Sequence, residues 1–311
     1  MQRNFPRSED ALQVMLARSM RPTLSIVGAG RVGTTLGKRL RERGWQIGAV
    51  ITRSTPTARA AVRAIGAGRP SADLALGVLA ADVILLTVPD DALAVVTARL
   101  AGIYGSVWRG KIVLHTSGAL DSNVLAPLAR LGAATGSLHP MQTFGGQIVP
   151  NLRGVTIAME GSAKALRVAR TLAKTLGGVP VVIAGRDKPA YHLAAVLAAG
   201  SAFPLIEISV EMLVSIGFSR RRALETLLPL TRQMLDNIER IGSRAAWTGP
   251  LSRGDYATVR KHIAALRRYP PEVRQSYAAL ALLAGRVLAT DPAATLKQIK
   301  RALGKTRTEE E

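Results

Sequence analysis

The stretch TLSIVGAGRVGTTLGKRLRERGWQIGAVITRS, residues 23–54, carries the strongest structural pattern in this chain. It opens with a short apolar run at 24–28 and continues through the glycine-rich segment GAGRVG. Apolar residues then recur at helical spacing over 34–44, until Gly44 ends the helix and a second apolar run follows at 45–52. A strand, a glycine turn, a helix and a second strand in this order predict the first βαβ unit of an open parallel sheet.

The segment GAGRVG at 28–33 is a full G-x-G-x-x-G pattern in the setting that gives it meaning, after a strand and before a helix. Its first glycine suits a tight turn, its second lets a pyrophosphate approach the backbone, and its third lets the helix pack on the strand. The helix N-terminus then attracts the phosphates. We therefore expect a Rossmann domain that binds a dinucleotide; a glycine-rich turn without a ligand is the alternative. The expected contacts here are Gly28, Gly30, Arg31, Val32 and Gly33.

The end of the second strand favours NADP over NAD. NAD-selective sites carry an Asp or Glu about 20 residues beyond the glycines, to bind the ribose hydroxyls. Thr52, Arg53 and Ser54 stand there instead, and a guanidinium with a hydroxyl suits a 2′-phosphate. A solvated loop arginine is the alternative for Arg53.

Further strands are expected at 81–89, 111–118, 134–140, 154–160 and 179–185. Because ligands lie at the carboxyl ends of such strands, we expect Val88, Pro89, Asp90 and Ser117 to line the cofactor site, with Asp90 alternatively serving only as a helix cap. Beyond Gly185 the pattern is helical throughout. The expected organisation is an extension at 1–20, an NADP-binding Rossmann domain at 21–185 and an all-helical domain at 186–311.

Composition excludes several classes. The 311 residues are 48% hydrophobic and 20% charged, which excludes a disordered chain. With no cysteine, thiolate zinc sites, iron–sulfur clusters and thiol nucleophiles are excluded. The most apolar stretch, 193–206, is short for a bilayer span and is expected to be a buried helix. We therefore expect a cytoplasmic protein without a membrane segment.

Positive charge dominates, with 42 Lys and Arg against 21 Asp and Glu and a net charge of +21. Such a balance suits nucleic acid or an anionic small ligand. The basic residues are spread along the chain in small groups such as 38–43, 220–222 and 267–268, without interleaved aromatics. The sequence therefore favours the anionic small ligand and makes nucleic-acid binding the weaker hypothesis.

The order and spacing of six motifs resemble a family of bacterial Rossmann-like NADP oxidoreductases whose C-terminal half is a domain of unknown function. The motifs are GAGRVG (28–33), ILLTVPDDAL (84–93), LHTSGAL (114–120), SLHPMQTF (137–144), AYHLAAVLAAG (190–200) and TGPLSRGD (248–255). The family is similar in architecture to pyrroline-5-carboxylate reductase, ketopantoate reductase and 6-phosphogluconate dehydrogenase. The resemblance implies an N-terminal cofactor domain, a cleft beside a helical domain, and a homodimer built from the helices. Where relatives carry a Ser-Asn pair, this chain has Ala199-Gly200, so Ser201 becomes a substrate candidate.

Lys188 and His192 are the candidate catalytic pair. They lie at i and i+4 near the start of a helix and therefore share a face. In the related β-hydroxyacid dehydrogenases a lysine on this helix acts as the acid, with an asparagine four residues later, so the resemblance implies a proton donor here. A solvated helix-start lysine and a satisfied histidine are the alternatives.

Other polar residues are candidates for the substrate. His139 ends a strand at the cofactor edge, whereas we expect His115 to be an ordinary strand histidine. Arg253 and Asp255 lie in a Gly/Pro loop, where Arg253 suits an anionic group and Asp255 alternatively caps the next helix. The four histidines lack metal-ligand spacing, so no metal is expected.

Three functions follow from these observations. The favoured one is an NADP-dependent oxidoreductase acting on a small carbonyl or imine. The alternatives are a non-catalytic NADP-binding sensor, which needs no proton donor, and a nucleic-acid binder, which rests on charge alone.

Overall fold

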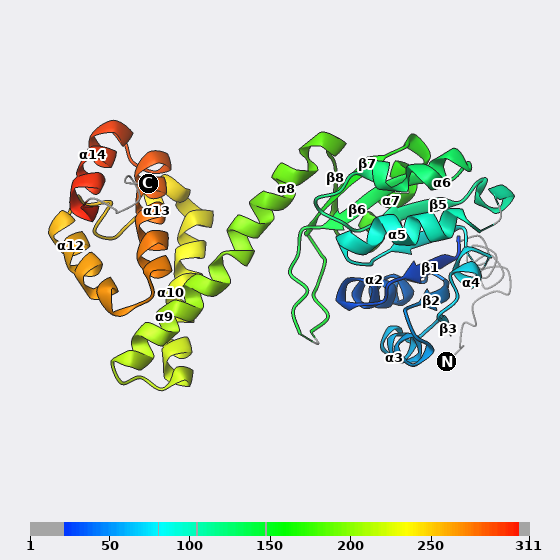
Figure 1. Ribbon diagram of the computed structural model, residues 1–311, viewed down its shortest axis with the longest axis horizontal. Coiled ribbons are helices and arrows are strands. Elements are labelled where there is room, and N and C mark those ends of the chain that lie inside the picture. Colours follow the sequence, from blue (N-terminus) through cyan, green and yellow to red (C-terminus); the bar gives the residue numbers. More distant parts are fainter. Residues whose placement is uncertain (1–21, 80, 104, 147, 305–311) are drawn as a thin grey trace, which may run out of the picture. The chain divides into compact units, whose positions relative to one another are not determined.

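The computed structural model describes residues 22–304 except 80, 104 and 147, so the expected extension at 1–20 lies outside the described residues. The chain divides into two compact units, one up to Gly200 and one from Ser201 (Figure 1). We call them the N-terminal and C-terminal units. The first helix beyond the expected boundary at 185 is thus part of the N-terminal unit.

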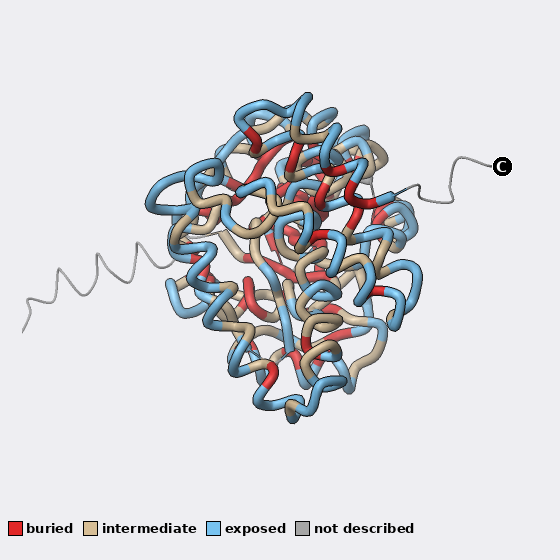
Figure 2. The backbone as a smooth tube through the Cα atoms, turned by 90° about the vertical axis from the view of Figure 1, so that its left-hand side faces the viewer, coloured by how far each residue is buried: buried red, intermediate tan, exposed pale blue. Residues whose placement is uncertain are grey.

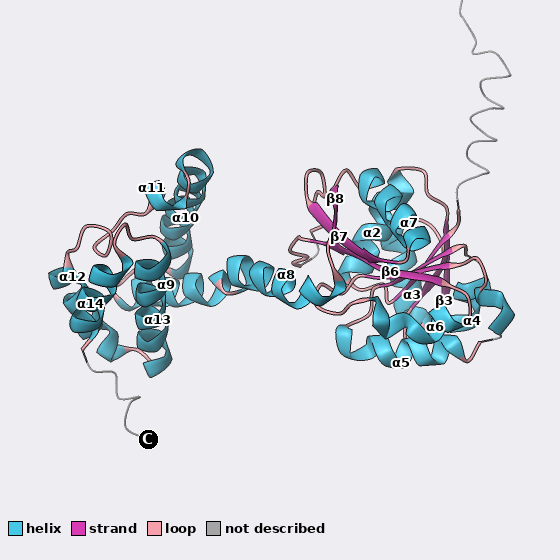
Figure 3. Ribbon diagram, turned by 90° about the horizontal axis from the view of Figure 1, so that it is seen from above, coloured by secondary structure: helices cyan, strands magenta, loops and turns pink. Residues whose placement is uncertain are grey.

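The N-terminal unit is an eight-stranded sheet with helices on both faces (Figure 3). Its strands are β1 (Leu24–Val27), β2 (Ile47–Ile51), β3 (Arg69–Ser71), β4 (Val83–Leu86), β5 (Ile112–His115), β6 (Ala134–Pro140), β7 (Thr156–Gly161) and β8 (Val179–Val182). Its helices are α2 (Arg31–Glu42), α3 (Thr55–Ile65), α4 (Leu74–Leu79), α5 (Asp90–Ala101), α6 (Ala126–Arg130), α7 (Ala163–Thr175) and α8 (Lys188–Ala195).

The strand order β3-β2-β1-β4-β5-β6-β7-β8 confirms the predicted doubly wound fold. The sheet is not entirely parallel, however, because β7 pairs antiparallel with β6, and β8 then runs parallel to β7. Parallel neighbours need a crossover, usually a helix. The described part of the connection 141–155 contains no helix, and the chain therefore returns in the opposite direction.

Two apolar cores hold the helices onto the sheet. On one face, Leu36 and Leu40 of α2, Ile65 of α3 and Leu172 of α7 are buried in one cluster with β1. On the other face, Leu93 and Leu100 of α5 pack with Leu128 of α6. Helices α2, α3 and α7 therefore form one layer and α4, α5 and α6 the other, with the buried residues drawn red in Figure 2. The central strand β4 is buried along its whole length, as its uninterrupted apolar run predicts.

The C-terminal unit is helical in its described part, as expected. It contains α9 (Ala202–Ser215), α10 (Arg220–Ile241), α11 (Ser243–Ala246), α12 (Tyr256–Ala265), α13 (Pro271–Val287) and α14 (Pro292–Leu303). Its small core joins Ala278 and Ala281 of α13 to Ile299 and Leu303 of α14.

The expectation of a buried apolar helix at 193–206 is wrong. Leu193, Leu197 and Phe203 are 55%, 62% and 68% exposed. The stretch Gly185–Ser215 is helical, and it is the one helix among the described residues long and apolar enough to cross a membrane by length and composition. Its most apolar window has a mean hydropathy of 1.9 and is 6% buried.

Candidate functional site

The glycine loop between β1 and α2 has the shape that a dinucleotide requires. Gly28 has a φ of +92°, and a Cβ there would lie 2.8 Å from the backbone nitrogen of Val88. A Cβ on Gly33 would collide with the Thr87 hydroxyl. Because glycine has no Cβ, α2 can pack close to the sheet here. A Cβ on Gly30 would meet nothing within 4 Å, so open space lies beside its backbone.

The N-terminus of α2 is free to receive an anion. Gly30 is its N-cap and offers no side chain, and the first turn has no acidic residue. The leading N–H groups of a helix then point outward with partial positive charge. This arrangement fits the pyrophosphate of a dinucleotide, with Arg31 exposed and Val32 half-buried in the first turn.

At the end of β2 a second helix begins beside Arg53. Ser54 caps α3 by accepting a hydrogen bond from the Thr57 backbone N–H at 3.4 Å, and the two hydroxyls lie 2.9 Å apart. Arg53 is exposed. A guanidinium, two hydroxyls and a helix N-terminus without a nearby carboxylate suit a 2′-phosphate. The Thr57 hydroxyl was missed in the sequence, although its place three residues after the cap could have indicated it.

Asp90 and Ser117 hold two neighbouring loops together. Val88 and Pro89 lead from β4 into α5, whose first residue is Asp90. The Ser117 hydroxyl donates to Asp90 Oδ2 at 2.8 Å and accepts from the N–H groups of Ala119 and Leu120. Both side chains are therefore engaged with the protein, and they brace the strand ends that face the cofactor loop.

Lys188 is buried at these strand ends. Only 1% of it is exposed, and its ammonium donates to the Ser117 carbonyl at 2.9 Å and to the Ser137 hydroxyl at 2.8 Å. Burial lowers the pKa of Lys188 to about 8, although the carboxylates of Glu160, Asp90 and Asp121 oppose this shift. An ammonium with a pKa near neutrality can exchange a proton under ordinary conditions.

Glu160 is a buried partner for this charge. No sequence pattern singled it out, because it lies inside an apolar strand. Its Oε2 accepts from the Ser122 hydroxyl at 2.9 Å, while its Oε1 has no hydrogen-bond partner among the described residues.

His139 and His192 meet edge to face beside Gly118. Their ring centroids are 5.7 Å apart, and a Cβ on Gly118 would lie 2.7 Å from His139 Nε2 and 2.6 Å from His192 Nδ1. His192 Nδ1 is buried and has no hydrogen-bond partner among the described residues. The Tyr191 hydroxyl lies 3.5 Å from His139 Nδ1.

Burial shifts the pKa values of His139 and Tyr191. The pKa of His139 falls to about 4, chiefly through burial and then through the nearby Lys188 and His192. Burial raises the pKa of Tyr191. His139 is therefore neutral at pH 7. One nitrogen of each imidazole lies beside Gly118, and the Tyr191 hydroxyl lies beside the other ring nitrogen of His139.

His115 is a strand histidine, as expected. Its side chain is fully buried, and its Nδ1 accepts from the Ser117 N–H, so Nε2 carries the proton and donates to the Asp121 carbonyl at 3.2 Å. Burial, reinforced by the charge of Lys188, lowers the pKa of His115 to about 3.

The remaining substrate candidates belong to the C-terminal unit. Ser201 precedes α9 and makes no side-chain cap bond. Arg253 is exposed. Asp255 caps α12 by accepting from the Thr258 N–H at 3.1 Å, and its pKa is lowered by hydrogen bonds from the Thr258 side chain and then from this N–H. Among the described residues no three His, Asp or Glu side chains gather as a metal ion would require.

Each half of the chain matches a known protein family. Residues 9–140 match the Rossmann-like domain, and residues 155–284 match the domain of unknown function DUF2520. No curated protein matches the chain.

Solved structures share the fold. Protein BF3122 from Bacteroides fragilis, named as a candidate NADP oxidoreductase, is 22% identical with a TM-score of 0.70, over 84% of this chain and 96% of its own. A reductive aminase from Aspergillus terreus in complex with NADPH and ethyl-5-oxohexanoate is 18% identical with a TM-score of 0.68, over 90% and 100%. An imine reductase from Pseudomonas sp. is 19% identical with a TM-score of 0.61, over 90% and 100%. The chain thus matches a Rossmann-like domain in its N-terminal part and DUF2520 in its C-terminal part.

Proposed function

We propose that this protein is an NADP-dependent oxidoreductase that transfers a hydride to or from a small carbonyl or imine. One observation supports this proposal above the others: three features lie at the same edge of the sheet. They are an open dinucleotide loop at Gly30, the buried Lys188, and the Nδ1 of His192, which has no hydrogen-bond partner among the described residues. The similarity to structures solved with NADPH and carbonyl compounds supports the same chemistry.

The residues that would hold NADP come from two loops. The N-terminus of α2 would hold the pyrophosphate, and Arg53 with Ser54 and Thr57 would hold the 2′-phosphate. When bound, the cofactor supplies or accepts the hydride.

The Lys188–His192 face would handle the proton. Both hydrogen bonds of the Lys188 ammonium go to protein atoms, whereas His192 Nδ1 has no hydrogen-bond partner among the described residues. We infer that His192 contacts the substrate heteroatom, with Lys188 supplying positive charge and a proton reservoir behind it. Lys188→Met is expected to lower the turnover number by ~10²-fold and leave NADPH affinity within a few-fold.

A further part of the proposal concerns assembly. Apolar side chains stay exposed along α8 and α9 and continue on α10 as Leu230, Met234 and Ile238. We propose that a second copy of the chain covers these side chains, giving a cytoplasmic homodimer. Sedimentation of the wild type and of Phe203→Glu tests the dimer; a monomeric wild type contradicts it.

We also propose that the substrate is anionic, because the guanidinium of Arg253 is exposed.

Cofactor binding is tested first. NADPH at 100 times its dissociation constant should stabilise the fold by about 2.7 kcal/mol. Turnover is then followed by NADPH absorbance over small ketones, keto acids, ketones mixed with amines, and cyclic imines. Absence of stabilisation by either nicotinamide cofactor refutes the proposal, while binding without turnover over the whole panel favours the sensor.

A further inference from the structure

Folding gathers positive charge into one helix layer of the N-terminal unit. Helices α2, α3 and α7 carry four, two and four Lys or Arg residues, against the single carboxylate of Glu42. The opposite layer, α4 to α6, is balanced, with two carboxylates on α5 and one arginine each on α5 and α6. Charges that look dispersed along the sequence therefore share one face.

Most of these cations have no partner in the part of the chain that the structure describes. Among the described residues, the only ion pair in this layer joins Arg39 to Glu42 at 3.2 Å. Eight further side chains make no hydrogen bond or ion pair with described residues. They are Arg31, which is assigned to the cofactor loop, together with Lys38, Arg41, Arg59, Arg63, Arg167, Arg170 and Lys174.

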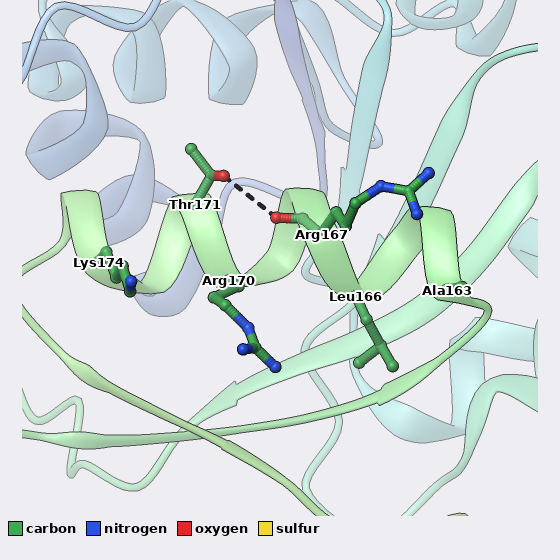
Figure 4. A pocket seen from close by; sticks show the side chains of 6 residues that line it. All are labelled: Ala163, Leu166, Arg167, Arg170, Thr171 and Lys174. Carbon is green, nitrogen blue, oxygen red and sulfur yellow. Dashed lines mark hydrogen bonds between the residues drawn. The ribbon is translucent and has the colours of Figure 1, made fainter.

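Helix α7 concentrates three of them along a shallow hollow of about 640 Å³ (Figure 4). Arg167, Arg170 and Lys174 line it together with Ala163, Leu166 and Thr171. The three cations span about 10 Å of helix, a length over which a duplex presents roughly six phosphates.

The rest of this layer indicates what kind of anion it suits. Among the described residues, α2, α3 and α7 expose no large hydrophobic side chain, and their sequences contain no aromatic residue. Lipid surfaces and protein partners are normally held partly by apolar anchors, and single-stranded nucleic acid by aromatic stacking. A face with cations alone suits a partner held by its phosphates alone.

We propose that helices α2, α3 and α7 form a docking surface for the phosphate backbone of a nucleic-acid duplex, independent of base sequence. Arginine suits this role because its guanidinium binds phosphate oxygens bidentately. The first turns of α2 and α3 belong to the proposed cofactor site, but the three cations on α7 that the test removes do not. The docking surface can therefore be tested independently of the proposed enzymatic activity.

The test measures fluorescence anisotropy of a labelled 20-base-pair duplex of mixed sequence with the full chain, from 50 to 300 mM NaCl. Six phosphate contacts predict that the logarithm of the binding constant falls with the logarithm of salt with a slope of about −5. The variant Arg167→Gln/Arg170→Gln/Lys174→Gln should reduce the slope by about 2.7 and weaken binding at least ~10-fold at 100 mM NaCl.

The matched control removes the same charge elsewhere. The variant Arg220→Gln/Arg221→Gln/Arg222→Gln also removes three positive charges. These arginines, however, lie on the C-terminal unit and pair with Glu207 and Glu225. This variant should bind the duplex within about three-fold of the wild type. Both variants should keep the wild-type circular dichroism spectrum and NADPH affinity.

Four results would overturn the proposal. Equal weakening by both variants would mean that binding follows net charge, and displacement of the duplex by saturating NADPH would assign binding to the cofactor loop. No detectable binding at 50 mM NaCl would remove the duplex as a partner. Tighter binding to vesicles with 30% phosphatidylserine, lost in the α7 variant, would assign the surface to a membrane.

Discussion

Replacing Lys188 by methionine should change how stability depends on pH. The wild-type ammonium is 1% exposed, and its pKa is about 8 in the folded protein against 10.5 in a solvated lysine. Between these two values the unfolded chain holds a proton that the folded chain has released. Wild-type stability therefore rises with pH across this window and loses that gain as the pH falls back through 8.

The magnitude follows from the same two values. At ~1.4 kcal/mol for each pH unit, this group adds about 3 kcal/mol to the free energy of unfolding between pH 8 and 10.5. The methionine variant lacks this gain. Near pH 7 the variant buries no charge, which favours its folded state. It also leaves the Ser117 carbonyl and the Ser137 hydroxyl without their donor, and each loss lowers the free energy of unfolding by roughly 1–3 kcal/mol. The two chains should thus be similar in stability near pH 7 and differ by about 3 kcal/mol at pH 10.5.

Urea unfolding of both chains at half-unit steps from pH 7 to 10.5 measures this difference, and groups common to both chains cancel. Lys164→Met, which removes an exposed lysine, is the control for loss of one ammonium. A wild-type-minus-variant difference that stays constant from pH 8 to 10.5 would refute the buried, pKa-shifted ammonium.

Three further perturbations test other parts of the site. Arg53→Asp should weaken NADPH at least ~10-fold more than NADH, measured by fluorescence titration, and equal losses would remove Arg53 from the 2′-phosphate site. Gly118→Ala inserts a Cβ 2.6 Å from His192 Nδ1 and should lower turnover at least ~10-fold while NADPH affinity holds; unchanged turnover would contradict the His139–His192 geometry. Because the pKa of His115 is about 3 when folded and 6.5 when solvated, its contribution is lost as the pH falls below 6.5. The stability advantage of the wild type over His115→Gln should therefore shrink by up to ~1.4 kcal/mol per pH unit down to pH 4, and a constant advantage in urea unfolding would disprove a buried neutral imidazole.

The cofactor half of the site was predictable because its constraints are local. The turn at Gly28, the contact of Gly33 and the first turn of α2 depend on residues close together in the sequence, apart from the strand that packs behind them. The proton-handling half was only partly predictable. The i, i+4 spacing put Lys188 and His192 on one helix face, but Tyr191, Gly118 and Glu160 gave no comparable pattern.

By itself, the sequence determined the strand and helix alternation, the glycine loop, the absence of a carboxylate after β2 and the helical nature of the C-terminal unit, because backbone propensity and hydrophobic periodicity act over a few residues. The reversal at β7, the burial of Lys188 and the clustering of cations on α2, α3 and α7 depend instead on contacts between distant parts of the chain. Lys188 bonds to residues 71 and 51 positions away, and its environment therefore exists only once the strand ends and α8 come together. Cations far apart in the sequence likewise become neighbours because three amphipathic helices turn their apolar sides to one sheet face and their charged sides to water.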